Sequence, residues 1–443
     1  MELGSWSLIQ GPSLLALIPL IIMIVLAFKG KNNISAIYIG IVVAALMMGQ
    51  DLKLLATAFS EAMSSSSALI GLIIMVGAGL GSLMSVTGVT QTMVYWIVKK
   101  IGVNTQTKAK ISLIVCSILI CGLLGTLGGG NAVISPIILP IMASLGVTPT
   151  VVAALFKTSG EIGLILGPLT GVTLITMEVT GLSYGKLMLT AALPFAIFWL
   201  AGTWIGCNRA QRLTEGKEFF SMSDEVKSLE DYKPTAKDTR TTVIFLVAFV
   251  LMIAYGFING AGTSYALIVM AALAVVLIVA SWTEVDEGVA ALCKGVSSMS
   301  YMFLLFVGIE VLLDYVTLGG GFDSLSNLLG GLATGGGGTG VMLAASIVGG
   351  FGIEAAAVAE IKIIAEMFGG MAAQVGLPAS ALAVPILAAT RLTGSMYPTS
   401  NFAGQMGTAQ CSNMKGALQA LWFGVGFAWV FVAGYAILFP MFI

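Results

Sequence analysis

Long apolar runs alternate with short polar segments along the chain, and this alternation gives the predicted helices. An apolar run of about 17 to 25 residues can cross the hydrocarbon core of a bilayer as a helix. A run over 69–98 is too long to be one straight span, and we expect it to bend at the Ser-Val-Thr-Gly sequence of 85–88. Two segments, 51–67 and 284–294, mix charged and apolar residues and are predicted to lie in the membrane interface. The other uninterrupted spans are predicted over 13–28, 34–48, 187–206, 241–257, 264–282, 299–318 and 417–439.

Four further apolar segments are interrupted by glycine, proline and small polar residues. Two of them, 111–145 and 341–375, are predicted to form helical hairpins, and two others, 150–177 and 379–409, are predicted to be interrupted spans. The glycine-rich segment 319–340 is predicted to be a loop. In hydrocarbon an unpaired backbone N–H or C=O costs several kcal/mol, so broken helices are tolerated where they line a cavity or a bound solute. The interruptions therefore mark a predicted binding site.

The predicted openings themselves consist of small residues. The first hairpin is expected to open over 128–131 (Gly-Gly-Gly-Asn) and the second over 349–352 (Gly-Gly-Phe-Gly). The first interrupted span is expected to break at two polar runs, 158–161 and 168–171, and the second over 393–401. An alternative interpretation is that these glycines only permit close packing between helices.

The same elements recur in the same order in the two halves of the chain. Each half offers two spans, an interfacial segment, a bent span, a hairpin, an interrupted span and a final span. The prolines of the interrupted spans repeat at nearly constant separation: Pro149 and Pro378 are 229 residues apart, and Pro168 and Pro398 are 230 apart. Because each half crosses the membrane an odd number of times, the second half is predicted to be inverted relative to the first.

These elements predict an all-α polytopic membrane protein built from two inverted-topology repeats. Each repeat has about five spans plus a re-entrant helical hairpin, with interrupted helices at the midplane. The first repeat is predicted over 1–208 and the second over 241–443. The only long polar stretch, 209–240, is predicted to be a cytoplasmic linker between them.

Composition supports the membrane assignment and narrows the chemistry. Of 443 residues, 58% are hydrophobic and 9% are charged, whereas a soluble domain carries about 25% charged residues. The net charge of -1 favours no nucleic-acid partner. The chain has no histidine and its five cysteines show no metal-binding spacing, so we expect neither an enzyme nor a cofactor. Carboxylates are then the expected protonatable groups.

Lysine and arginine gather in a few connecting segments, which predicts the orientation of the chain. They are concentrated in 29–31, 99–110 and 209–240, with Lys415 between the last two spans. Threading the predicted spans places all four on one face, which the positive-inside rule makes cytoplasmic. We therefore expect a multi-pass protein of the cytoplasmic (inner) membrane with both termini outside.

Charged residues at membrane depth are the first candidates for function, because burying them in a bilayer is costly. The separation of 230 residues places Glu161 opposite Arg391. Arg391 is the candidate ligand for a substrate carboxylate, since its planar guanidinium can bind a carboxylate through two parallel hydrogen bonds. A structural Glu161–Arg391 ion pair is the alternative. The other charged candidates are Lys157, Glu310, Asp314 and Glu354.

Uncharged oxygens and amides beside the interruptions are the second set of candidates. Together with opened backbone carbonyls, they suit sodium or substrate hydroxyls. They are Asn131, Ser159, Thr170, Thr393, Ser395, Thr399, Ser400 and Asn401.

The interrupted segments also carry a resemblance to known transporters. The sequences GGGN, KTSGEIGLILGPLTG and LTGSMYPTSNFAGQ, in two halves that each place a hairpin before an interrupted span, resemble the ion transporter superfamily of secondary carriers. The layout is similar to that of the gluconate permease and C4-dicarboxylate carrier families. The Ser-Asn-Thr hairpin signature of the dicarboxylate and sodium branch is replaced by Gly130-Asn131-Ala132.

The resemblance implies where substrate and ion bind. Hairpin tips and broken spans of that superfamily form the site, which adds Gly130 and Gly160 to the candidates. Substrate binding is therefore assigned to Gly130, Asn131, Ser159, Gly160, Arg391, Thr399, Ser400 and Asn401. Ion coupling is assigned to Glu161, Thr170, Glu354, Thr393 and Ser395.

The predicted function is secondary active transport of a small organic anion, a carboxylate or sugar acid, coupled to H⁺ or Na⁺. By resemblance we expect an elevator-type movement and a homodimer in the lipid bilayer. One alternative is a Na⁺/H⁺ antiporter of the same fold, and another is the membrane subunit of a carrier that depends on an extracytoplasmic binding protein. A channel is disfavoured, because discontinuous sites between inverted halves suit alternating access.

Overall fold

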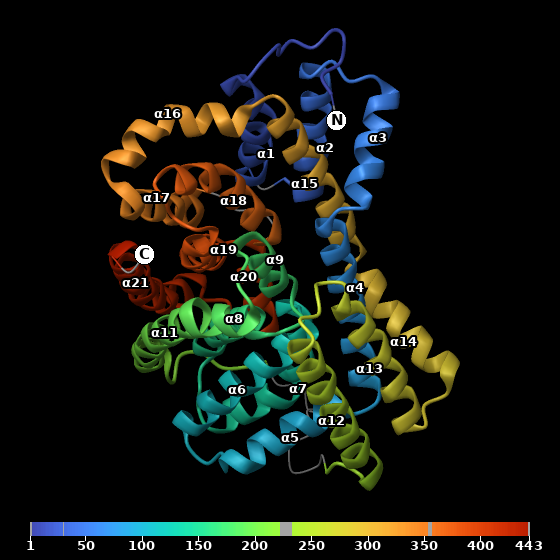
Figure 1. Cartoon of the computed structure of the whole chain (residues 1–443). Helices are drawn as coiled ribbons and strands as arrows, with labels where there is room; N and C mark the ends of the chain where they lie inside the picture. The colour runs from blue at the N-terminus through green and yellow to red at the C-terminus, as the bar shows by residue number, and fades with distance from the viewer. Residues whose placement is uncertain (1, 30, 222–232, 353–356, 442–443) are drawn as a thin grey trace.

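The computed structural model describes residues 2–29, 31–221, 233–352 and 357–441, and within these ranges all regular secondary structure is helical (Figure 1). The first half has a short 3-10 helix over Leu14–Leu17 and a π-helical turn over Met188–Ala192. Its α-helices are α1 (Ile18–Phe28), α2 (Asn33–Met47), α3 (Leu52–Met63), α4 (Ser66–Val86), α5 (Val89–Ile101), α6 (Gln106–Leu124), α7 (Leu127–Ser144), α8 (Pro149–Leu166), α9 (Gly171–Thr180), α10 (Tyr184–Leu187) and α11 (Leu193–Thr214).

The second half repeats this order of elements. A 3-10 helix over Ala379–Leu382 precedes α19, and another over Phe439–Met441 follows α21. Its α-helices are α12 (Ala236–Ile258), α13 (Tyr265–Ser281), α14 (Val285–Ser298), α15 (Ser300–Leu318), α16 (Gly321–Gly335), α17 (Gly337–Gly352), α18 (Ala357–Gln374), α19 (Ala383–Met396), α20 (Ser400–Thr408) and α21 (Met414–Leu438).

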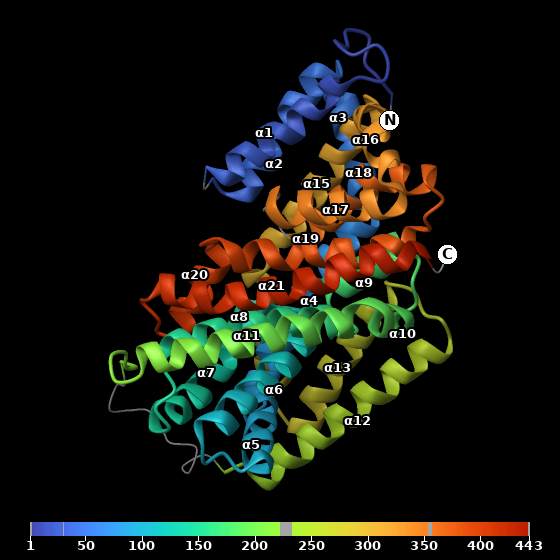
Figure 2. The same ribbon diagram turned by 90° about the vertical axis from the view of Figure 1, so that its left-hand side faces the viewer.

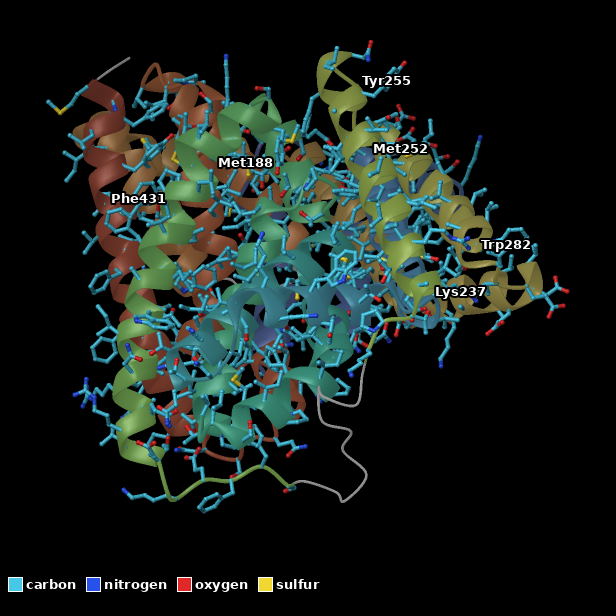
Figure 3. All side chains as sticks on the ribbon, turned by 90° about the horizontal axis from the view of Figure 1, so that it is seen from below. Met188, Lys237, Met252, Tyr255, Trp282 and Phe431 are labelled. Carbon is cyan, nitrogen blue, oxygen red and sulfur yellow. The ribbon has the colours of Figure 1, made fainter. Side chains whose placement is uncertain are left out.

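Eight of the described helical segments are long and apolar enough to cross a membrane, which confirms a polytopic all-α membrane protein. Large apolar side chains lie exposed on the outer helices, as expected where lipid replaces water. Ile268 is 64% exposed and Trp282 is 79% exposed. Figure 3 shows Trp282 and Tyr255 at the periphery of the molecule.

Side chains at helix starts define several boundaries. The Asp51 carboxylate accepts a hydrogen bond from the backbone N–H of Leu54 at 2.8 Å, which caps α3. Thr235 and Asp238 form a reciprocal capping box at the start of α12. The expected bend between α4 and α5 is confirmed at Gly88, which adopts a φ of 74° that favours glycine.

Helix pairings recur between the halves. α6 packs on α8 as α17 packs on α19, and α11 packs on α8 as α21 packs on α19. Figure 2 shows α8, α11, α19 and α21 stacked across the middle of the molecule, with α1, α2 and α16–α18 on one side and α5–α7, α12 and α13 on the other. In the same view α21 runs to the right-hand end of the stack, where the C label lies, whereas α20 lies at the opposite end. The inverted sense of the second half stays a prediction.

The breaks of both interrupted spans are confirmed, at narrower positions than the sequence predicted. α8 and α9 are separated by 167–170, and α19 and α20 by 397–399. The predicted opening over 158–161 is wrong, because these residues lie inside continuous α8. A Cβ on Gly160 would lie 2.2 Å from Leu127 Cδ1 and 3.0 Å from Asn131 Nδ2. This glycine therefore permits close helix packing and does not open the backbone.

The predicted opening of the first hairpin is also displaced. α6 ends at Gly125, whose φ of 65° closes the helix, and α7 starts at Leu127. The Gly-Gly-Gly-Asn sequence of 128–131 is therefore helical, and a Cβ on Gly130 would lie 2.5 Å from Cys121 Sγ on the facing arm. The predicted opening at 349–352 lies at the end of α17, and residues 353–356 lie outside the described part of the chain.

The predicted loop over 319–340 is wrong as well. Most of it forms α16 and the start of α17. Phe322 is buried to 6% exposure, and Asp323 lies in the first turn of α16, where a carboxylate stabilises a helix. The many glycines of this segment lower helix propensity, but tertiary packing can override such a local preference.

Candidate functional site

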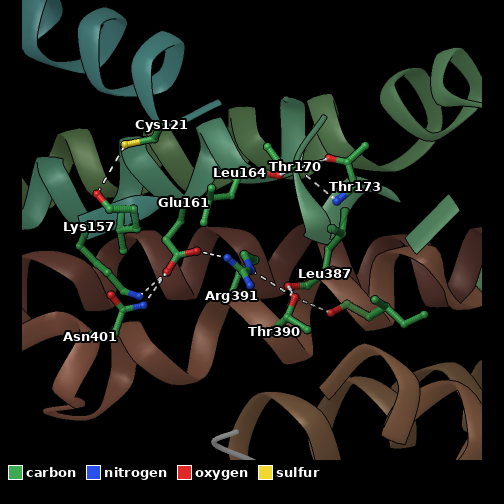
Figure 4. A network of polar contacts seen from close by, with 12 residues as sticks. Cys121, Lys157, Glu161, Leu164, Thr170, Thr173, Leu387, Thr390, Arg391 and Asn401 are labelled. Atoms are coloured by element: carbon green, nitrogen blue, oxygen red, sulfur yellow. Dashed lines mark hydrogen bonds and ion pairs between the residues drawn. The ribbon is translucent and has the colours of Figure 1, made fainter. Parts of the chain in front are cut away.

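One buried carboxylate lies between two buried cations where the interrupted spans meet (Figure 4). Lys157 Nζ donates to Glu161 Oε1 at 2.7 Å, and both side chains belong to α8. Arg391 Nη1 on α19 donates to Glu161 Oε2. The three side chains are only 2% to 3% exposed. The predicted Glu161–Arg391 ion pair is therefore present.

The first turn of α20 reaches the same cluster. Asn401 Nδ2 lies 3.4 Å from Glu161 Oε1, and the Asn401 side chain is exposed. A Cβ on Gly394 would lie 2.9 Å from Lys157 Nζ and 3.7 Å from Thr399 Oγ1. The cluster thus lies beside the second break, close to residues that reach the surface.

Arg391 does not use its whole guanidinium group. Its Nε donates to Thr390 Oγ1 at 3.2 Å and its Nη1 donates to Glu161, but Nη2 makes no hydrogen bond to the described residues. A guanidinium presents five N–H donors in a planar fork. Its unused donors can therefore bind a further anionic oxygen.

Asn131 cross-links the first hairpin to both interrupted spans. Its Oδ1 accepts from Ser117 Oγ at 2.7 Å. Its Nδ2 donates to the Phe156 carbonyl at 2.9 Å and to Gln405 Oε1 at 2.7 Å. With its amide fully bonded and 0% exposed, Asn131 ties α6, α7, α8 and α20 together in this conformation.

The first break is closed by side chains. Thr170 caps α9, and its hydroxyl donates to the Leu164 carbonyl at 2.5 Å. Tyr184 Oη donates to the Leu166 carbonyl at 2.6 Å. Carbonyls that helix termination would free are thus occupied here. The predicted site residue Ser159, inside α8, donates its hydroxyl to the Leu155 carbonyl.

The second break is more open. Tyr397 and Pro398 are exposed, whereas Thr399 is buried and caps α20 by accepting from the backbone N–H of Phe402 at 3.1 Å. Thr393 Oγ1 lies 3.2 Å from the Gly349 carbonyl and 2.9 Å from the Gly350 carbonyl of the second hairpin. Thr393, before this break, therefore contacts the second hairpin, while Tyr397 and Pro398 within the break are exposed.

The remaining predicted residues divide into two groups. Ser395 is fully buried, and its hydroxyl finds no hydrogen-bond partner within the described chain. Glu354 and the Ser400 side chain lie outside the described residues. The structure therefore gathers Glu161, Arg391, Thr399 and Asn401, and places Gly130, Asn131 and Gly160 at the packed hairpin behind them.

Sequence reasoning missed three polar partners of this network: Ser117, Gln405 and Thr390. Gln405 lies four residues after Asn401 on α20, so helical spacing puts both on one face, and this signal could have found it. Thr390 could have been noticed as the neighbour of Arg391. Ser117 carries no such signal, because a serine within an apolar helix usually bonds to its own backbone.

A second charged cluster lies where α4, α15 and α18 meet. Lys362 Nζ donates to both Glu310 oxygens, at 3.0 and 2.8 Å, and Ser67 Oγ donates to Glu310 Oε2 at 2.6 Å. Glu310 and Lys362 are 16% and 14% exposed. Glu310 is thus part of an ion pair between the second hairpin and α15.

Comparisons with known proteins agree with a carrier fold. A sequence model of the C4-dicarboxylate anaerobic carrier family (DcuC) matches residues 56–442. The YdaH transporter of Alcanivorax borkumensis matches with a TM-score of 0.57 and 14% identity, over 88% of each chain. MtrF of Neisseria gonorrhoeae, described as illuminating a class of antimetabolite efflux pumps, matches with a TM-score of 0.63 and 14% identity, over 98% of this chain and 96% of that one. The search of curated proteins gives no match.

Proposed function

The chain belongs to the C4-dicarboxylate anaerobic carrier family, and from this we propose that it is a secondary active transporter that moves a small organic anion, first of all a C4-dicarboxylate, coupled to H⁺ or Na⁺. The observation that carries the proposal is the Arg391 guanidinium. It is buried between the two interrupted spans, beside the exposed second break, and it keeps donors that the described residues do not use.

One substrate carboxylate binds at Arg391 in this proposal. The Nη2 group donates to it, and the first turn of α20 contributes the positive end of the helix dipole and the Asn401 amide. Arginine suits this role because the matching planes of guanidinium and carboxylate allow two parallel hydrogen bonds. The second carboxylate of a C4 substrate extends from Arg391 toward the exposed Tyr397 and Pro398.

Glu161 links substrate to the coupling ion. A substrate carboxylate competes with Glu161 for Arg391, and a carboxylate that loses a cationic partner binds a proton more readily. Substrate and proton then cross together, while the empty site keeps its Glu161–Arg391 pair. Sodium is the alternative coupling ion, with Thr393, Ser395 and the hairpin carbonyls of Gly349 and Gly350 as its oxygens.

Transport by this arrangement requires movement of the loaded site. We propose that the hairpins and interrupted spans move as one body against the remaining helices, in an elevator-type cycle within a homodimer. The Glu310–Lys362 pair lies between α15 and a hairpin arm, so it crosses this boundary. The Asn131 network lies within the moving body and would stay intact.

The test is uptake of labelled succinate by the full chain in proteoliposomes under an imposed pH gradient, an imposed sodium gradient, or neither. We expect uptake with one gradient and competition by other C4-dicarboxylates. If C4-dicarboxylates are not taken up under any of the three conditions, and a pH dye reports proton movement driven by sodium, the protein is an antiporter instead. Uptake that appears only with a soluble binding protein would make the chain a subunit of a larger carrier.

A further inference from the structure

A basic groove lies between α11 and α21, outside the transport site. It has a volume of about 200 Å³, and its lining includes glycine and alanine residues of both helices. Arg209 from the end of α11 and Lys415 from the first turn of α21 both line it. From this groove we infer a binding site for the headgroup of an anionic phospholipid.

The cations of the groove have no protein counterion. No ion pair or hydrogen bond of the Arg209 or Lys415 side chain occurs within the described residues. The Arg209 guanidinium instead lies 5.6 Å from the centre of the Phe423 ring, which holds it across the groove. The nearby Glu218 carboxylate accepts hydrogen bonds from Thr150 Oγ1 at 2.6 Å and Asn413 Nδ2 at 2.7 Å, and within the described residues it forms no ion pair with either cation. Two positive charges are therefore available to an anion.

The surroundings of the groove match a membrane surface. On α11, Arg209 lies on the same helical face as Ile205 and Leu213, which are 45% and 54% exposed. On α21, Trp422 is 51% exposed two turns beyond Lys415. Basic pockets between spans on the cytoplasmic side bind anionic headgroups. The acyl chains would then lie along the exposed apolar faces of α11 and α21.

A lipid at this position would contact the helix that supports the second break. Trp422 Nε1 donates to the Met396 carbonyl, the last of α19, at 3.2 Å. Close packing of α11 on α21 depends on small residues: a Cβ on Gly206 would lie 2.1 Å from the Ala420 carbonyl oxygen. A bound headgroup that bridges Arg209 and Lys415 therefore stabilises the helix pair beside the interrupted spans.

The test compares the full chain with R209Q/K415Q and with R212Q/K217Q, which removes the same charge from exposed residues that do not line the groove. The proteins are reconstituted in phosphatidylcholine alone or in phosphatidylcholine with about 20% cardiolipin, which gives the membrane a strong negative surface charge. Native mass spectrometry counts retained cardiolipin, and thermal unfolding gives the melting temperature in each lipid.

We expect the wild type and R212Q/K217Q to retain cardiolipin and to melt several degrees higher when it is present. R209Q/K415Q should retain at least tenfold less and lose the shift, while melting like the wild type in phosphatidylcholine alone. Equal retention by R209Q/K415Q, or equal loss by the control variant, would contradict the site. A matching shift of the wild type with inorganic phosphate would also overturn it, since the groove would then bind free anions.

Discussion

Arg391 has two roles in our proposal, as the partner of Glu161 and as the ligand of a substrate carboxylate, and substitutions can separate them. Removing one member of a buried ion pair costs about 3–5 kcal/mol, because the other charge stays buried. In R391Q, however, Glu161 keeps Lys157 as its cationic partner, so we expect uptake to be lost with a smaller loss of thermal stability. E161Q/R391Q also takes the Glu161 carboxylate away from buried Lys157, so we expect it to melt lower than R391Q while uptake stays absent. Uptake by the double variant would give Arg391 a structural role alone.

Two asparagines near the site should respond differently to truncation. Asn131 is buried and hydrogen-bonded to three other helices, whereas Asn401 is exposed and makes one long contact with Glu161. We expect N131A to lose about 1–3 kcal/mol of stability, because Gln405 and the Phe156 carbonyl lose their donor. N401A should melt like the wild type but raise the KM for substrate. Unfolding curves and uptake kinetics measure both, and equal stability of the two variants would contradict the assignment.

At the scale of elements, replacing two helical glycines by alanine should change the melting temperature in different ways, although the sequence alone does not distinguish the two positions. A Cβ on Gly163 would lie 2.5 Å from the Ile118 carbonyl oxygen, whereas one on Gly128 meets nothing within 4 Å. Both residues are helical. We expect G163A to separate α6 from α8 and lower the melting temperature. G128A should leave it unchanged or raise it, since alanine favours a helix by up to about 1 kcal/mol. Destabilisation by G128A would indicate that the 128–131 segment is not helical.

This contrast explains how far the sequence predicted the elements. Apolar run length predicted the spans well, because crossing a bilayer needs a minimum helix length. Proline and glycine predicted the breaks at Pro168 and Pro398 and the bend at Gly88. Proline has no N–H to donate to the helix, and Gly88 adopts a positive φ that ends the helical geometry. Runs of glycine gave wrong predictions of an opening at 128–131 and of a loop at 319–340, because glycine both opens a backbone and lets two helices approach closely. Only the facing atoms decide between these outcomes.

The candidate site was predictable at the level of the whole molecule. A separation of 230 residues in the sequence pairs Glu161 with Arg391, and the two side chains are in contact. The same separation pairs Leu166 with Met396, and each of these carbonyls accepts a hydrogen bond from an aromatic donor, Tyr184 or Trp422. The partners themselves were not predictable, because they depend on side-chain packing that differs between the halves.

Movement of the whole molecule should depend on the Glu310–Lys362 pair. An elevator cycle must break this contact, because Glu310 belongs to α15 and Lys362 to the second hairpin. K362Q leaves Glu310 unpaired beside Asp314, one helical turn away, so we expect a lower melting temperature and slower uptake. E310Q/K362Q removes both charges and should restore stability, with a kcat at or above that of the wild type because no ion pair has to open. Uptake kinetics and thermal unfolding of the three proteins test this. Loss of uptake by a stable double variant would show instead that the pair takes part in coupling.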